Sequence, residues 1–256
     1  TVDKNRKLKY EQIFRDNLDV KEDPIIQDYK KKPFTRITFK PDYNKFGIEA
    51  LSQDMIALLY KRAYDIVATT NSKVSVHFNE NKIEIDCFAS YMKLYMKNNN
   101  STTNDDIKTN ETIEELKEPD FITQNVNDRW LIGACLTPSF GFKQVSFVNG
   151  INTTRGGKHV DYVTKQITSH IVDYIQKKKK ITVKENIIKE NIMVFVNSTI
   201  VNPSFDSQTK ETLTTNKSKF GSECIISTKL IEELANMGVV ERAINLSKFQ
   251  DTQLLI

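Results

Sequence analysis

The sequence predicts an α+β protein. Stretches in which apolar and polar residues alternate, typical of strands, are interspersed with longer stretches that repeat apolar residues at helical spacing. Apolar residues make up 39% of the 256 positions, which allows a hydrophobic core although the fraction lies below the usual range. The length suits one large domain or two small ones.

The N-terminal part of the chain, 1–32, is charged and sparsely apolar, and a short helix or strand is possible over 10–18. Alternation predicts a strand over 34–40 and a hairpin of strands around 74–78 and 83–85. Between them Ser52, a favourable N-cap, begins a helix with Asp54 in its first turn. This helix is expected to bury an apolar stripe: Met55, Leu58, Leu59, Ala63, Ile66 and Val67.

In the second half the same patterns predict strands over 130–137, 143–149 and 192–204. A long helix over 158–176 carries one apolar stripe, and a short polar helix is expected over 183–191. Ser227 is a plausible N-cap for one last helix. Its expected buried face consists of Leu230, Ile231, Leu234, Met237, Val240, Ala243, Ile244 and Phe249.

Residues 98–120 are rich in Asn, Thr, Asp, Glu and Lys, and cannot bury enough apolar surface to hold a fold. We interpret this segment as a solvated surface insertion, in preference to a partner-binding segment.

Charge and cysteine content exclude several classes of protein. The formal net charge of +4 weakly favours a polyanionic partner. The three cysteines are far apart and have no CxxC spacing, so neither a disulfide framework nor a zinc site is expected, and a reducing compartment fits. No metal site is predicted, and no apolar run is long enough for a membrane span. The chain starts at Thr1 without a signal peptide, and we expect it to be a fragment of something longer.

One loop suggests phosphate chemistry. An apolar run ends near Val201, and Asn202–Lys210 then reads NPSFDSQTK, with Pro203 unable to donate to a strand. A lysine held on such a loop presents a compact positive charge with three donors, which suits a phosphate. The alternative is a solvated surface loop, and spacing alone favours that alternative.

Two further basic stretches each have a structural and a functional interpretation. Residues 153–158, TTRGGK, precede a helix, where an anion can bind, but they lack P-loop spacing and are interpreted as a structural turn. Lys177–Lys180 follow the predicted helix. They either cap its C-terminus in solvent or form a phosphate-binding patch.

Two long stretches, in this order, resemble eukaryotic type II DNA topoisomerases: Ser146–Val163 (SFVNGINTTRGGKHVDYV) and Asn202–Lys210. Arg62–Ile66 (RAYDI) also matches that family. The resemblance implies that 1–87 is the C-terminal portion of a GHKL-type ATPase domain, an α/β sandwich, without its nucleotide site. Residues 88–256 are then a transducer domain like domain 2 of ribosomal protein S5, with a junction helix over 88–96, the insertion 98–120 and a long C-terminal helix.

The resemblance also implies a function: part of an ATP-dependent enzyme that passes one DNA duplex through another. Lys210 is then the catalytic residue that contacts the γ-phosphate and stabilises the transition state, with Gln208 and Thr209 beside it in the nucleotide-binding switch loop. A lysine-rich loop, here Gln176, Lys177, Lys178, Lys179 and Lys180, faces DNA. It lacks the glycines that usually follow in relatives.

The partners and cofactors implied are those of the complete enzyme: ATP with Mg, double-stranded DNA, and a second copy in a homodimer, in the nucleus. The catalytic glutamate, Mg-binding asparagine and ATP lid are not found in this sequence, so the chain alone is expected to be inactive and to bind no nucleotide. Two alternatives are a non-catalytic nucleic-acid-binding module with an S5-like fold and a clamp ATPase like MutL or Hsp90. The match over Ser146–Val163 argues against the clamp ATPase.

Overall fold

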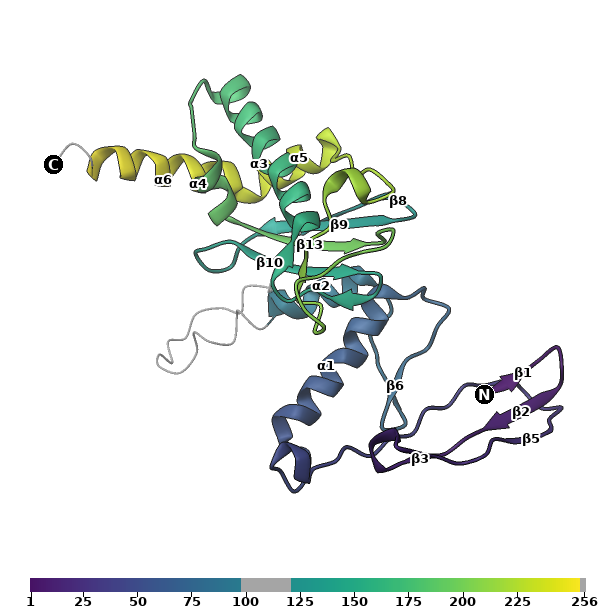
Figure 1. Ribbon diagram of the computed structural model, residues 1–256. Coiled ribbons are helices and arrows are strands. Elements are labelled where there is room, and N and C mark those ends of the chain that lie inside the picture. The colour runs from purple at the N-terminus through teal and green to yellow at the C-terminus, as the bar shows by residue number, and fades with distance from the viewer. Residues whose placement is uncertain (98–120, 254–256) are drawn as a thin grey trace, which may run out of the picture. The chain divides into compact units, whose positions relative to one another are not determined.

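The computed structural model describes residues 1–97 and 121–253, in two compact units, Thr1–Ala57 and Leu58–Ile256 (Figure 1). The predicted insertion 98–120 lies outside the described residues. No helix in the described ranges is both long enough and apolar enough to cross a membrane.

The first unit is built from short strands. Its larger sheet is antiparallel, in the order β1-β2-β5, and β3 and β4 form a separate pair. These strands span Val2–Asp3 (β1), Leu8–Glu11 (β2), Phe14–Arg15 (β3), Val20–Lys21 (β4) and Ile25–Asp28 (β5), and single 3-10 turns lie at Asp16–Leu18 and Asn44–Phe46.

The strand predicted over 34–40 is wrong. None of these residues joins a sheet among the described residues, and Ile37 and Phe39 are 85% and 80% exposed. Alternation marks a segment that suits a pleated, half-buried surface, but a strand also needs a neighbour to satisfy its backbone groups.

The second unit holds the main core. Its elements are α1 (Gln53–Thr69, whose first residues belong to the first unit), β6 (His77–Phe78), β7 (Asn81–Lys82), α2 (Phe88–Lys97), β8 (Ile122–Asn127), β9 (Trp130–Leu136), β10 (Lys143–Val148), β11 (Ile151–Asn152), β12 (Gly156–Gly157), α3 (Lys158–Lys179), α4 (Glu185–Glu190), β13 (Ile192–Ser198), β14 (Thr212–Leu213), a 3-10 turn (Lys217–Lys219), α5 (Thr228–Leu234), a π-helical turn (Ala235–Val239) and α6 (Val240–Gln253).

The central sheet of this unit has five strands in the order β11-β10-β13-β9-β8. β10 and β13 are parallel neighbours, and α3 and α4 lie between them in the chain, so this connection is the crossover that a parallel pair requires. The other neighbouring pairs in the sheet are antiparallel.

The alternation of β13 divides the unit into two apolar layers. Ile192, Val194 and Val196 face a core that includes residues of α3, α4, α5 and α6. Met193 and Phe195 face the other side, where Phe88, Tyr91, Met92 and Met96 of α2 cover them. A strand buried on both faces has a continuous apolar sequence, which explains the run that predicted this strand.

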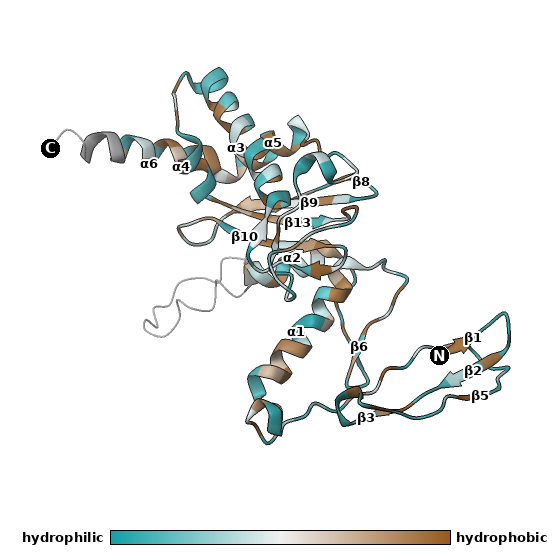
Figure 2. Ribbon diagram, viewed as in Figure 1, coloured by the Kyte–Doolittle hydropathy of each residue, from teal (hydrophilic) through white to brown (hydrophobic). Residues whose placement is uncertain are grey.

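The buried stripe predicted for α1 is only partly confirmed. Ala63 and Val67 are buried, whereas Met55, Leu58, Leu59 and Ile66 remain exposed. Figure 2 shows hydrophobic and hydrophilic stretches in succession along α1. An apolar stripe shows that a helix face suits a partner, but not that the same chain supplies one.

Two boundaries differ from prediction, and one predicted cap is confirmed. The helix predicted to end at Gln176 runs through Lys179, so the lysines form its last turn instead of following it. The strand predicted to reach residue 204 stops at Ser198, five residues before Pro203. Ser227 does cap α5, accepting a hydrogen bond from the amide of Leu230 at 3.2 Å.

The last helix is broken where the sequence predicts continuity. Gly238 has φ +96° inside the π-helical turn, a conformation that glycine adopts without a steric penalty. The predicted face is buried at Leu230, Leu234, Val240 and similar positions, but Phe249 is exposed. The predicted stripe therefore continues into α6 at Ala243 and Ile244, which are buried, and fails at Phe249.

Candidate functional site

The loop 202–210 is held by backbone pairing on the side of β14. Phe205 forms an antiparallel bridge with Leu213, and the amide of Thr214 donates to the carbonyl of Ser204 at 2.9 Å. The Ser204 amide donates to Thr215 Oγ1 at 2.7 Å. The two arms of the loop are therefore tied together, and only its tip projects.

Side-chain hydrogen bonds shape the tip. Asp206 Oδ1 accepts from the Thr212 amide at 3.1 Å, and the hydroxyls of Ser207 and Thr209 lie 2.8 Å apart. The hydrogen bond from Thr212 holds the pKa of the Asp206 carboxyl below its usual range. The amide of Lys210 donates to the carbonyl of Ser207 at 3.1 Å, which closes the turn. An aspartate bonded in this way favours a fixed turn over an open loop.

Lys210 occupies an unusual backbone conformation. Its φ is +58°, in the left-handed region that a residue with a Cβ seldom adopts. Its side chain is half-buried, and Nζ lies 5.9 Å from the ring centroid of Phe205. Gln208 and Thr209 are exposed beside it. The loop thus presents all three predicted nucleotide-binding residues together at its tip.

The acidic neighbour of Lys210 is engaged elsewhere. Glu211 Oε2 lies 3.0 Å from Nε of Arg155, and the Arg155 amide donates to the Glu211 carbonyl at 3.0 Å. Within the described ranges no carboxylate forms an ion pair with the Lys210 ammonium, so its charge remains available to an anion. Sequence reasoning missed this pairing, because the two residues are distant in the chain.

The glycine-rich turn before α3 pairs with the residues that follow the loop. Gly156 and Gly157 pair in parallel with Thr212 and Leu213, the residues that follow the loop. A Cβ at Gly157 would lie 2.3 Å from the Leu213 carbonyl oxygen, and its φ is +124°. Only glycine fits this position, because a side chain there would meet backbone.

The predicted DNA-binding residues lie at the opposite end of α3. Gln176 and Lys177–Lys180 are all exposed, and Lys180 ends the helix with φ +59°. Gln176 Oε1 accepts a hydrogen bond from Thr182 Oγ1 at 3.2 Å. The helix has 22 residues, so at 1.5 Å per residue this basic end and the start of α3 are roughly 33 Å apart. The two predicted sites are therefore separate.

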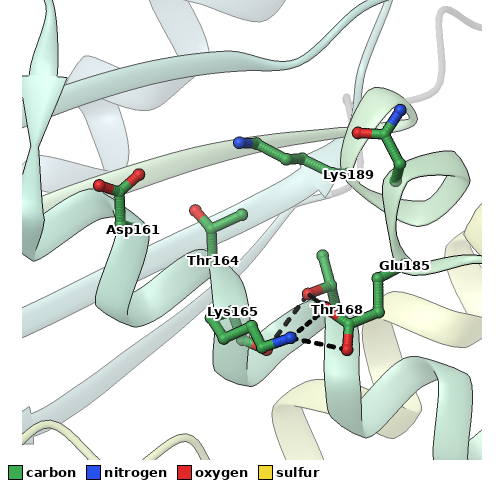
Figure 3. Close-up of a pocket in the computed structure, with 7 residues that line it drawn as sticks. Asp161, Thr164, Lys165, Thr168, Glu185 and Lys189 are labelled. Carbon is green, nitrogen blue, oxygen red and sulfur yellow. Dashed lines mark hydrogen bonds and ion pairs between the residues drawn. The ribbon is translucent and has the colours of Figure 1, made fainter.

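A shallow hollow of about 290 Å³ lies between α3 and α4 (Figure 3). Within it Lys165 contacts both carboxylate oxygens of Glu185, at 2.9 and 2.7 Å. The ammonium of Lys189 lies 5.0 Å from the ring centroid of Phe142. Both cations already have partners, and no described residue that lines the hollow is a glycine, so it does not offer a phosphate cradle.

Nor do the described residues gather a metal site. Within these ranges no group of three or more His, Cys, Asp or Glu side chains is arranged to hold a metal ion.

The family model "DNA gyrase B" matches residues 87–253. The chain belongs to the DNA gyrase B family. Within this family its similarity is to the eukaryotic enzymes: it is 41% identical over 256 residues to DNA topoisomerase 2 of Arabidopsis thaliana. It is 40% identical over 253 residues to human DNA topoisomerase 2-alpha. These alignments cover 99% and 98% of this chain but 16% of each relative, so the chain spans about a sixth of their length.

Solved structures of the gyrase B family agree with the fold. The ATPase region of Saccharomyces cerevisiae topoisomerase II matches with a TM-score of 0.80 at 32% identity, over 96% of this chain and 59% of that one. The ATPase and transducer domains of Balamuthia mandrillaris topoisomerase II match with a TM-score of 0.77 at 30% identity, over 98% and 60%. The predicted α+β fold and the predicted resemblance are confirmed.

Proposed function

We propose that this chain is the part of an ATP-dependent type II DNA topoisomerase that senses the γ-phosphate of ATP and passes the ATPase state to the DNA gate. Residues 1–87 are the C-terminal portion of the ATPase domain, and 88–256 are the transducer. The complete enzyme uses ATP with Mg, acts on double-stranded DNA as a homodimer and works in the nucleus. The proposal rests on membership of the gyrase B family and on the presentation of Lys210.

The observation that carries the sensing role is the state of the Lys210 ammonium. It lies on a turn tied down by Asp206, its acidic neighbour Glu211 is neutralised by Arg155, and it forms no ion pair with a described carboxylate. A fixed, uncompensated cation is what an electrostatic catalyst needs, because it loses little free energy to reorganisation when negative charge develops.

In this mechanism Lys210 donates to γ-phosphate oxygens, with Gln208 and Thr209 as flanking polar contacts. ATP supplies the phosphoryl group that is transferred, and Lys210 stabilises the charge that spreads over its oxygens in the transition state. After hydrolysis and phosphate release the Lys210 ammonium no longer has this partner. The transducer then favours a second orientation, since ligand binding shifts an equilibrium only through interactions that differ between its states.

The basic end of α3 is proposed to face DNA. Lys177, Lys178, Lys179 and Lys180, with Gln176 beside them, place adjacent positive charges at one exposed helix end. Such a cluster attracts phosphates without reading sequence, as a topoisomerase that acts on any duplex requires.

The decisive experiment is Lys210→Ala in the full-length enzyme, measuring ATP turnover and DNA binding separately. The proposal expects slow turnover with DNA binding retained, and normal turnover would refute it. Lys219→Ala is the control, because Lys219 is an exposed lysine of the neighbouring 3-10 turn.

A further inference from the structure

A buried carboxylate joins α1 to α2. Asp65 is 3% exposed, and its Oδ1 accepts a 2.7 Å hydrogen bond from the hydroxyl of Tyr91. Its Oδ2 accepts from Lys61 Nζ at 2.8 Å and from Arg62 Nη1 at 3.3 Å. A buried charge needs such partners, because its desolvation is otherwise uncompensated. The carboxylate therefore fixes where the Lys61 ammonium lies.

Lys61 has a second acceptor on the central sheet. Its Nζ donates to Asn152 Oδ1 at 3.0 Å, and Asn152 Nδ2 donates to the carbonyl of Ser146 at 3.0 Å. Asn152 closes β11, the strand that folds back antiparallel on β10. By contrast, Arg62 contacts the same carboxylate of Asp65, and no hydrogen bond joins it to Asn152 within the described ranges.

From Asn152 a short segment leads to the base of the Lys210 loop. The amide of Thr153 donates to the Ser146 carbonyl at 2.8 Å, and the Gly156 amide donates to the Thr153 carbonyl at 2.9 Å. Gly156 and Gly157 then pair with β14, and Arg155 holds Glu211. The segment 152–157 thus contacts Lys61 at Asn152. At its other end it pairs with Glu211–Leu213, the residues that directly follow Lys210.

We propose that Lys61 is a positioning residue that, through Asn152 and the segment 152–157, couples the C-terminal half of α1 to the Lys210 loop. This inference rests on the proposed γ-phosphate role of Lys210 and adds a residue that never touches the nucleotide. Lys61 suits the role because its single ammonium contacts one residue on α1 and one on the sheet. A displacement of that half of α1 therefore changes the anchor of the segment on which the loop rests.

The test is a double-mutant cycle in the full-length enzyme, with Lys61→Met, Lys210→Ala and the combination. If Lys61 acts through Lys210, Lys61→Met lowers kcat for ATP hydrolysis by about fivefold or more, in the range of ordinary coupling between sites. KM for ATP changes less than kcat, and the double variant has the kcat of Lys210→Ala alone. Multiplying effects in the double variant, or an unchanged kcat in Lys61→Met, would overturn the inference.

Arg62→Met is the matched control. It removes the other cation of the same carboxylate, so its loss of thermal stability should resemble that of Lys61→Met, while kcat stays near the wild-type value. Equal losses of kcat in the two variants would show that Asp65 only stabilises the fold. Lys61→Arg, which keeps a donor and the charge, should restore most of the rate.

The design also separates this inference from the proposed function. If Lys210→Ala alone hydrolyses ATP normally, the γ-phosphate role fails. If Lys210→Ala is slow and Lys61→Met is additive with it, only the coupling fails. Should Lys61→Met fold poorly, Asn152→Ala removes the acceptor on the sheet, and its kcat effect should likewise vanish in the Lys210→Ala background.

Discussion

Glu211, the residue directly after Lys210 in the chain, forms an ion pair with Arg155, whose Nε lies 3.0 Å from Oε2 of Glu211. The pair is exposed on its arginine side and contributes little to stability. Its consequence is electrostatic, because Arg155 keeps the carboxylate of Glu211, the acidic residue nearest in sequence, from pairing with the Lys210 ammonium. Next to this ion pair, the pairing of β12 with β14 fixes the backbone that directly follows Lys210 and Glu211.

Removing the arginine should release a competitor for the lysine. In the full-length enzyme Arg155→Met frees Glu211 to pair with Lys210, and we expect kcat for ATP hydrolysis to fall by up to about fivefold, the range of an exposed ion pair. Adding Glu211→Gln removes the competing charge and should restore the rate. A double variant as slow as Arg155→Met would show that competition is not the cause.

Lys210→Ala should slow ATP hydrolysis in the full-length enzyme by about a hundredfold or more, as for loss of one preorganised transition-state donor. Thermal stability should hardly change, because the side chain is only half-buried and has no ion-pair partner among the described residues. Steady-state ATPase assays and thermal melts of this variant and of Lys219→Ala measure both effects. A large drop in melting temperature would instead assign the lysine a structural role.

Gly157→Ala should destabilise the second unit by about 2 kcal/mol or more, because the steric overlap of the new Cβ and the strained φ both raise the free energy of the folded state. The new Cβ would lie 2.3 Å from a backbone oxygen of Leu213, which cannot move aside as a flexible side chain can. Gly141→Ala is the control, since Gly141 also has positive φ, +104°, with nothing within 4 Å of the added carbon. In thermal unfolding, the melting temperature of Gly157→Ala should lie well below that of Gly141→Ala. Equal losses of melting temperature in the two variants would mean that backbone strain alone is responsible.

Neutralising Lys177–Lys179 with glutamine should weaken DNA binding and flatten its salt dependence. Each phosphate that is no longer neutralised reduces the slope of log K against log salt by about 0.9, so the slope should fall by up to about 3. Lys30–Lys32 are an equally long run of exposed lysines and serve as the control. Measurements of DNA affinity from low to moderate salt concentration test this prediction. An unchanged slope of log K against log salt would mean that the lysines at the end of α3 are solvated and do not contact DNA.

Acid should destabilise the fold through His159. Burial lowers the pKa of this imidazole to about 3, and Nε2 lies 3.2 Å from Thr153 Oγ1. In the unfolded chain a histidine has a pKa of about 6.5, so below that pH the unfolded state binds the proton and the folded state does not. The contribution is complete above pH about 6.5 and is lost at about 1.4 kcal/mol per pH unit as the pH falls toward 3.

Urea unfolding at a series of pH values measures this effect. His159→Gln should make the loss of unfolding free energy with falling pH less steep than in the unmodified chain, by the contribution of one proton. An acid slope unaltered in His159→Gln would place the destabilising proton elsewhere.

Much of the second unit could be predicted from sequence because its signals are local. The continuous apolar run of β13 and the cap at Ser227 each depend on nearby residues. The cap is confirmed, and the strand is confirmed over Ile192–Ser198 but not on to residue 204. The site residues were predicted by resemblance, whereas spacing alone favoured a solvated loop at 202–210. Their roles stay predictions until the variants above are measured.

The sequence by itself determined the presence of α3, of the strands β9, β10 and β13 and of the cap at Ser227, and the identity of the basic residues, because these follow from period, capping and composition. Only the tertiary structure decided that Arg155 neutralises Glu211, that Gly157 meets the backbone of Leu213, and that Lys61 reaches Asn152. It also decided that residues 34–40 have no strand partner in the described part of the chain and that α6 leaves Phe249 exposed. The physical reason is that these outcomes depend on which distant segments meet, and a local pattern specifies that a surface needs a partner without specifying which one.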